Sequence, residues 1–196
     1  MAARGAGRLR IAAEARRTPV VPNGALGMLI FVASEAMLFA GLISAFTIIR
    51  SSALVWPPPD QPRLPVEETL VNTAALLLSG VALFLAQRTF ARDWRRAARP
   101  LVVAIALGAF FVVAQGVEWV ALIREGLTLT SSTLGSFFYL IVGLHALHAV
   151  VALAGLAYTW ALLQRGWRAG NQLAAASVFW YFVVGLWPIL YGVVYL

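Results

Sequence analysis

The sequence predicts an all-α, polytopic membrane protein built as a bundle of five transmembrane helices. Of its 196 residues, 61% are hydrophobic and only 12% are charged, and the mean hydropathy is +0.83. That composition is too apolar for a soluble domain of this length. Five windows reach the roughly 20 apolar residues that cross a bilayer. Their apolar character is continuous rather than alternating, which favours helices over the strands of a β-barrel.

The five windows follow one another closely, so they form one domain over residues 25–196. They cover residues 26–49, 70–89, 101–123, 134–163 and 173–196. Short connections make consecutive helices antiparallel neighbours in a bundle. The first connection is the longest and contains three successive prolines, Pro57 to Pro59, which impose an extended course.

Arginine supplies every cationic side chain, and its distribution predicts the orientation in the membrane. Twelve of the fifteen arginines lie in the N-terminal segment 1–24, in residues 88–99 or in residues 165–168. The positive-inside rule therefore places the Arg-rich segment 1–24 in the cytoplasm and, after five crossings, the C-terminus outside. The net charge of +7 is explained by topology and by attraction for anionic headgroups. We expect no nucleic-acid partner.

The residue inventory excludes several kinds of chemistry. The chain has no cysteine, which excludes disulfides, thiolate metal sites and cysteine nucleophiles. Residues 1–24 lack the apolar run of a secretory signal peptide. Their arginine-rich composition is similar to that of a mitochondrial transit segment, but no serine precedes Ser34 and the segment leads directly into a span, which argues against that reading. No nucleophile–base pair and no phosphate-binding glycine loop stands out, so no catalytic residues are assigned. A subunit of a larger assembly, a small transporter or a structural membrane protein remains.

Ionisable side chains inside the spans are costly and indicate where function lies. They are Glu35, Glu118, His145 and His148. Glu35 falls close to mid-membrane, where it either bonds a serine or backbone carbonyl or takes part in lipid, proton or partner contact.

The two histidines are three residues apart and share a helix face. They cannot approach one haem from opposite sides, and only Glu35, Glu118 or a methionine could complete a metal site. We therefore expect no metal or cofactor bound by this chain and a structural or lipid-facing hydrogen-bonding role for the histidines. Trp180 and Tyr181 lie well inside the last window, where we expect them to pack against another helix or a partner.

Several motifs occur together in one order. They are "GMLIFVASEAMLFAGL" at 27–42, "LVNTAALLLSG" at 70–80, "QGVEW" at 115–119, "GSFFYLIVGLHALHAVVAL" at 135–153 and "FWYFVVGLW" at 179–187. Jointly they resemble subunit III of the haem-copper oxidases, over all five spans. The larger members of that family have seven helices, and this chain resembles a shorter five-helix form that lacks the first two.

The resemblance also identifies individual positions. The residues that match the family pattern are Glu35, Asn72, Thr73, Gln115, Glu118, Gly143, His145, His148, Trp180, Phe182, Val183 and Trp187. The chain departs from the pattern at Tyr181, where the family has histidine, at Val184, where it has aspartate, and at Val142, where it has threonine. These departures indicate a divergent branch.

The resemblance implies a non-catalytic subunit in a bacterial cell membrane. It would dock on the haem- and copper-bearing subunit I, beside subunit II, hold phospholipid between its helices and support proton uptake and turnover stability. The electron donor, cytochrome c or quinol, is decided by other subunits. We further hypothesise that Glu35, Glu118, His145 and His148 form one interhelical polar set, while cytoplasmic arginines hold anionic headgroups.

Two alternatives belong to other classes. An accessory protein of a nitric oxide reductase would carry the same motifs. A small proton-coupled transporter would use Glu35 and the histidines as a relay, but the five windows show no inverted repeat and no matching pair of broken helices.

Overall fold

Five long helices dominate the computed structural model, which describes residues 23–56, 62 and 64–196. They are α2 (Asn23–Ser52), α3 (Val66–Arg92), α4 (Ala98–Arg124), α5 (Thr133–Gln164) and α6 (Gly170–Leu190). Each is long and apolar enough to cross a membrane, and no strand occurs in the described ranges, which confirms the predicted fold class. Most of the predicted N-terminal segment and Pro57 to Pro59 lie outside the described residues.

The helices extend a few residues beyond the apolar windows, because polar residues at their ends continue the same hydrogen-bonding pattern. At the start of α5, the Ser132 hydroxyl oxygen accepts a 3.0 Å hydrogen bond from the Gly135 N–H. The last window is divided in two, since a π-helical turn, η2 (Tyr191–Tyr195), follows α6. Pro188 lies three residues before this turn and lacks the N–H that would continue the regular ladder.

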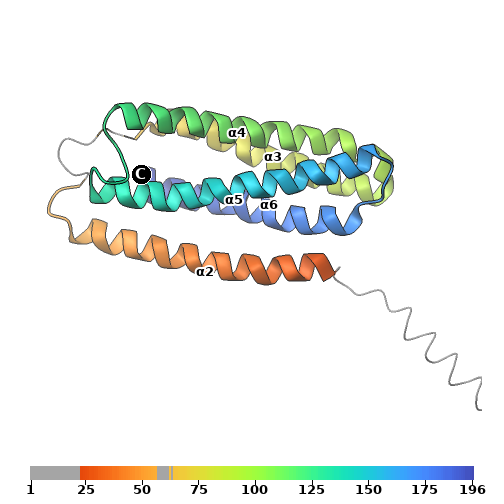
Figure 1. Ribbon diagram of the computed structural model, residues 1–196, viewed down its shortest axis with the longest axis horizontal. Helices are drawn as coiled ribbons and strands as arrows, with labels where there is room; N and C mark the ends of the chain where they lie inside the picture. Colours follow the sequence, from red (N-terminus) through yellow and green to blue (C-terminus); the bar gives the residue numbers. More distant parts are fainter. Residues whose placement is uncertain (1–22, 57–61, 63) are drawn as a thin grey trace, which may run out of the picture.

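Helices α3 to α6 form a closed bundle, and α2 lies along its outside (Figure 1). In the bundle α3 packs on α4, α4 on α5, α5 on α6, and α6 on α3. Helix α2 packs chiefly along α6 and touches α5 much less. The expectation that all consecutive helices are neighbours is therefore wrong for α2 and α3. The long first connection explains this, because it allows α2 to cross to the far side of the bundle.

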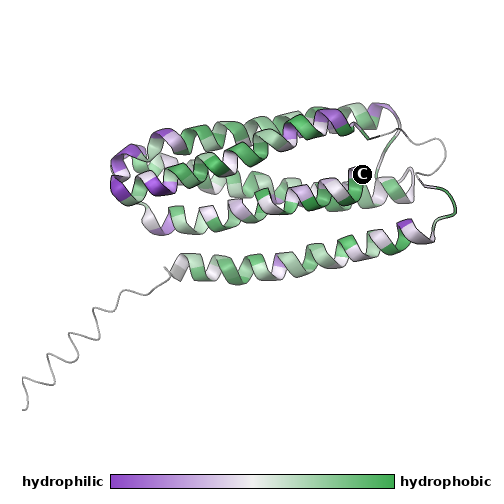
Figure 2. Cartoon of the chain, turned by 180° about the vertical axis from the view of Figure 1, so that it is seen from behind, coloured by the Kyte–Doolittle hydropathy of each residue, from purple (hydrophilic) through white to green (hydrophobic). Residues whose placement is uncertain are grey.

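Figure 2 shows strongly hydrophilic residues gathered at the end of the bundle that holds the α3–α4 connection. The arginine-rich end contains the α3–α4 and α5–α6 connections, with exposed Arg88, Arg92, Arg95, Arg96, Arg99, Arg165 and Arg168. The other end, here named the C-terminal end, contains the α4–α5 connection and the chain terminus. There Arg50 of α2 donates hydrogen bonds to the carbonyl oxygens of Val193 (2.9 Å) and Leu196 (3.1 Å). That the arginine-rich end faces the cytoplasm stays a prediction.

The core consists mostly of side chains from α3 to α6. Trp180, Trp187, Phe111 and Phe138 are among its largest fully buried members. Among the α2 side chains that the structure describes, only Ala25, Phe39 and Phe46 are buried. Helix α2 is therefore the element with the weakest hold on the bundle, and its few polar contacts gain importance.

Candidate functional site

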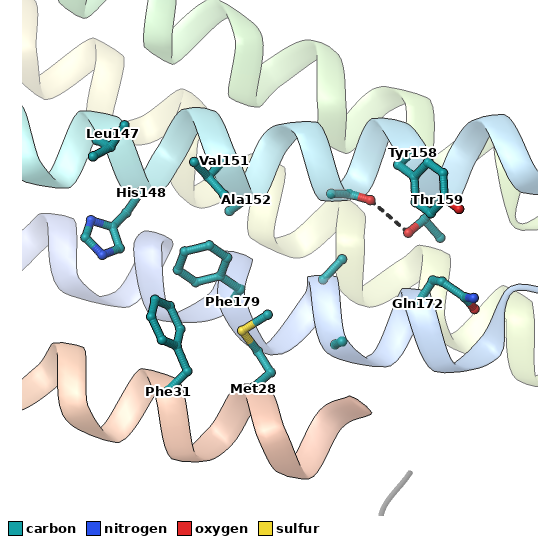
Figure 3. Close-up of a pocket in the computed structure, with 13 residues that line it drawn as sticks. Met28, Phe31, Leu147, His148, Val151, Ala152, Tyr158, Thr159, Gln172 and Phe179 are labelled. Atoms are coloured by element: carbon teal, nitrogen blue, oxygen red, sulfur yellow. Dashed lines mark hydrogen bonds between the residues drawn. The ribbon is translucent and has the colours of Figure 1, made fainter. Parts of the chain in front are cut away.

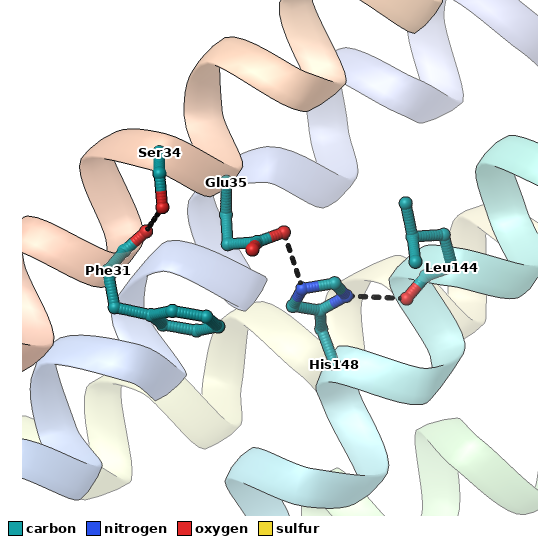
Figure 4. Close-up of polar contacts among 5 residues, drawn as sticks. All are labelled: Phe31, Ser34, Glu35, Leu144 and His148. Carbon is teal, nitrogen blue, oxygen red and sulfur yellow. Dashed lines mark hydrogen bonds and ion pairs between the residues drawn. The ribbon is translucent and has the colours of Figure 1, made fainter.

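A hydrogen bond near the middle of α2 joins this helix to α5 (Figure 4). His148 Nε2 lies 2.9 Å from Glu35 Oε2, and His148 Nδ1 lies 2.7 Å from the carbonyl oxygen of Leu144. A carbonyl only accepts, so Nδ1 carries a hydrogen and donates it. One further proton is shared between Nε2 and Glu35: either the carboxylic acid donates to Nε2, or a charged imidazolium donates to the carboxylate. The pair can thus hold a proton on either partner.

The surroundings of this pair are aromatic. The His148 ring lies 5.5 Å from Phe39, 5.8 Å from Phe179 and 6.5 Å from Phe31, between ring centroids. The side chains of His148 and Glu35 are 9% and 17% exposed. In so apolar a setting, a polar group that lost its partner would keep the full cost of desolvation. Ser34 does not cap Glu35, because its hydroxyl donates to the Phe31 carbonyl at 2.7 Å.

A cavity of about 640 Å³ begins at His148 and lies between α2, α5 and α6 (Figure 3). Phe31, His148 and Phe179 line one part, and Tyr158, Thr159 and Gln172 line the part nearer the arginine-rich end. The remaining lining residues are Met28, Leu147, Val151, Ala152, Gly155, Ala175 and Ala176. Most of its walls are therefore apolar. The cavity exists because α2 follows α6 and leaves space beside α5.

A second polar cluster joins α3, α4 and η2 near the C-terminal end. Gln115 Nε2 donates to Glu118 Oε2 at 2.8 Å and to the Tyr195 hydroxyl at 3.1 Å. Asn72 Nδ2 donates to Gln115 Oε1 at 3.3 Å, and the Thr69 hydroxyl lies 3.0 Å from Glu118 Oε2. Glu118 is thus held by side chains from two helices. The cluster fixes the last turn of the chain to α4.

Three aromatic side chains of α6 make polar contacts with α3. The indole N–H of Trp187 donates to the Thr73 hydroxyl at 2.8 Å, and that of Trp180 donates to the Ser79 hydroxyl at 3.0 Å. The Tyr181 hydroxyl donates to Gln87 Oε1 at 2.8 Å. All three pack against another helix of the same chain and tie α6 to α3 along its length.

The structure separates the ionisable residues that we had placed in one set. Glu35 and His148 form the first cluster, and Asn72, Gln115 and Glu118 belong to the second. His145 joins neither: it is 1% exposed, and neither ring nitrogen has a hydrogen-bond partner among the described residues. In the described ranges, no group of three or more His, Cys, Asp or Glu could hold a metal ion.

Four participants in these contacts are not among the residues predicted from the sequence, namely Thr69, Ser79, Gln87 and Tyr195. Thr69 could have been found, because it lies three residues before Asn72 on the same helix face. Tyr195 could not, because its hydroxyl reaches Gln115 only through the π-helical turn, which no spacing in the sequence indicates.

Comparison with known proteins decides the family. Residues 11–196 match the family model described as cytochrome c oxidase subunit III. The chain belongs to the cytochrome c oxidase subunit III family. Among its relatives, a probable cytochrome c oxidase subunit 3 of Mycobacterium leprae is 34% identical over 176 residues, which cover 87% of this chain and 86% of the relative.

Other organisms contain similar proteins. The probable cytochrome c oxidase subunit 3 of Nocardia farcinica is 30% identical over 177 residues, covering 87% of this chain and 86% of the relative. The cytochrome c oxidase subunit 3 of Felis catus is 30% identical over 193 residues, covering 93% of this chain and 73% of the relative. The family indicated by the motifs is therefore confirmed, and the chain is a multi-pass membrane protein in a respiratory oxidase family.

Two positions that depart from the subunit III pattern have a local account. Tyr181, in place of histidine, donates to Gln87. Val184, in place of aspartate, packs against Gly80, where an added Cβ would lie 3.2 Å from Val184 Cγ1. The apolar Val184 side chain packs on Gly80 where the family has an aspartate carboxylate, so this position places no charge in the bundle.

Proposed function

We propose that this chain is a non-catalytic subunit of a respiratory terminal oxidase and docks on subunit I beside subunit II. It holds phospholipid in the cavity between α2, α5 and α6. It also supports proton uptake and stability of the complex during oxygen reduction. One observation carries the lipid part of the proposal. The Glu35–His148 pair lies at one end of an apolar cavity of about 640 Å³ that extends toward the arginine-rich end.

The chemistry of the cavity suits a phospholipid chain. Its volume falls within the range of about 300 to 1,000 Å³ that is usual for ligand sites. Its walls are apolar, while Gln172 and the exposed Arg165 and Arg168 lie toward the arginine-rich end. Arginines near a membrane surface attract anionic headgroups by about 1 kcal/mol each. A phospholipid could place its acyl chain against the apolar cavity walls and its phosphate near these arginines.

The Glu35–His148 pair would hold the lipid cavity in shape. Helix α2 has two polar attachments described above, this pair at mid-membrane and Arg50 at the C-terminal end. The pair borders the cavity at His148, whereas Arg50 does not line it. Hydrogen bonds inside membranes contribute only about 0.6 kcal/mol on average and up to about 1.7 kcal/mol. Loss of the pair should therefore loosen α2 before it prevents insertion.

Haem and copper belong, in this proposal, to the partner subunit I. The two histidines of this chain do not fit an axial pair, because they lie one turn apart on α5. Both nitrogens of His148 are occupied, and the His145 ring is stacked on Trp187 at 5.0 Å between centroids. No redox step is assigned to this chain.

The oxygen-reducing complex is favoured over the nitric oxide alternative by the relatives, which are named as subunits of cytochrome c oxidase. The relatives from Mycobacterium leprae and Nocardia farcinica support a bacterial origin and hence the cell membrane as the location.

The test is purification of the complex through a tag on this chain in mild detergent. A visible spectrum and mass spectrometry of the proteins would report docking: haem absorbance with a stoichiometric subunit I supports it, and a colourless protein without that partner contradicts it.

Native mass spectrometry of the same complex would report lipid. Gly155→Leu fills the cavity from α5, where an added Cβ makes an ordinary 3.7 Å contact with Ala176. Gly41→Leu on α2 is the matched control, because nothing lies within 4 Å of its added Cβ and it does not line the cavity. The proposal predicts loss of bound phospholipid with Gly155→Leu alone. Equal lipid content in both variants and the parent would contradict it.

A further inference from the structure

We propose that a second, smaller cavity, between α4, α5 and α6, is a binding site for water centred on His145. Its volume is about 180 Å³. Its lining residues are Phe111, Val112, Gln115, Gly116, Trp119, Val142, His145, Ala146 and Trp187. None of these residues lines the lipid cavity, so this inference stands apart from the lipid proposal.

His145 has an unmet demand for hydrogen bonds. A neutral imidazole has one donor and one acceptor nitrogen. Both nitrogens of His145 are buried without a partner in the part of the chain that the structure describes. The ring is held by Trp187, stacked at 5.0 Å, and by the edge of Phe111 at 6.4 Å, so the side chain cannot turn freely toward another acceptor. Buried polar groups are normally satisfied by protein or by ordered water.

Two further residues that carry polar groups, Trp119 and Gln115, line the same cavity. The indole N–H of Trp119 is also buried without a partner among the described residues. Gln115 Oε1 accepts from Asn72 and has a second lone pair available. His145, Trp119 and Gln115 thus supply donors and acceptors of the kind that hold an internal water, which makes about three hydrogen bonds.

Most of the cavity lining is apolar, but its size admits water and His145 lines it with both ring nitrogens unpartnered among the described residues. An internal water requires only about 10 to 15 Å³ of probe-occupied volume, so the cavity has room for several. An acyl chain would leave the polar groups unsatisfied. A metal ion lacks the ligands it needs among the described residues.

Water in this cavity would extend the polar cluster of the C-terminal end toward mid-membrane. The series would run from Glu118 to Gln115, through the cavity water, to His145, which is 12 residues or about 18 Å from the start of α5. Hydrated polar groups would then reach within one helical turn of His148.

The test is X-ray radiolytic hydroxyl-radical labelling of the intact purified complex, followed by mass spectrometry. Trp187 and Trp180 form a matched pair: both are fully buried in α6, and each donates its indole N–H to a hydroxyl of α3. Only Trp187 lines the cavity. Because radicals form from bound water, Trp187 should be labelled several-fold faster than Trp180. Equal rates would overturn the proposal, and a cavity filled by lipid would give that result.

A pair of glycine variants sharpens this test. Gly116→Leu places a side chain at the cavity from α4, where nothing lies within 4 Å of the added Cβ. Gly185→Leu adds the same side chain on an exposed face of α6 that does not line the cavity, again with nothing within 4 Å of the added Cβ. Labelling of Trp187 should fall to the rate of Trp180 in Gly116→Leu and stay at the parental rate in Gly185→Leu. Unchanged labelling in both would overturn the proposal. If Gly116→Leu does not assemble, His145→Phe replaces it, with the same two outcomes.

Discussion

His145 and His148 lie one helical turn apart on α5 and both contact Phe39, yet their hydrogen bonding is opposite. Both nitrogens of His148 are engaged, one by Glu35 and one by the Leu144 carbonyl, while neither nitrogen of His145 has a partner in the described structure. His148 borders the larger apolar cavity under α2, and His145 borders the smaller one between α4 and α6.

The two histidines of α5 therefore line two different cavities. Three residues along a helix turn a side chain by about 60° from the starting direction, at 3.6 residues per turn. That rotation suffices to direct His148 to α2 and leave His145 among Phe111, Phe39 and Trp187. The two histidines thus serve two sites. The bond from His148 to Glu35 positions α2, and the His145 ring takes water as its hydrogen-bond partner in our proposal.

The largest effect is expected from breaking the fixed bond. His148→Leu leaves the Glu35 carboxyl without its partner in an apolar site, which costs about 1 to 3 kcal/mol. The subunit should therefore be lost from the complex several-fold more readily on detergent washing, with less bound lipid. Quantitative mass spectrometry of the washed complex measures this. Full stoichiometry, full lipid content and unchanged turnover stability would contradict the role given to His148.

A smaller effect is expected from Glu35→Gln. The amide N–H of glutamine can still donate to His148 Nε2, because Nδ1 already carries the hydrogen that goes to Leu144. The cost should stay near the average intramembrane hydrogen bond, about 0.6 kcal/mol. The same washing assay should show retention close to that of the parent. A loss as large as that of His148→Leu would show that the carboxyl does more than accept or donate one bond.

The smallest effect is expected from His145→Phe. Phenylalanine keeps the ring that stacks on Trp187 and removes two polar atoms that no described residue satisfies. Subunit retention should therefore change by no more than the equivalent of about 0.5 kcal/mol, the lower limit for a net hydrogen bond. A loss equal to that of His148→Leu would reverse the comparison between the two histidines.

Much of this architecture could be predicted from the sequence. The apolar windows gave five spans, and the cost of charge in lipid marked Glu35, Glu118 and both histidines. The pairing could not be predicted, because it depends on which helix lies beside which. Helix α2 reaches α5 through Glu35 only because it packs along α6, and the Tyr195 contact with Gln115 depends on a π-helical turn. The hydrophobic periodicity of the sequence predicts neither the packing of α2 along α6 nor the π-helical turn.

The most direct test of the account is a cryo-electron microscopy map of the intact oxidase in lipid nanodiscs, at a resolution that shows ordered water elsewhere in the spans. We expect elongated acyl-chain density beside His148 in the cavity under α2. We also expect separate rounded peaks within hydrogen-bonding distance of His145 in the cavity between α4 and α6. Absence of elongated density beside His148, or acyl-chain density beside His145, would contradict the division of the subunit into a lipid side and a water side.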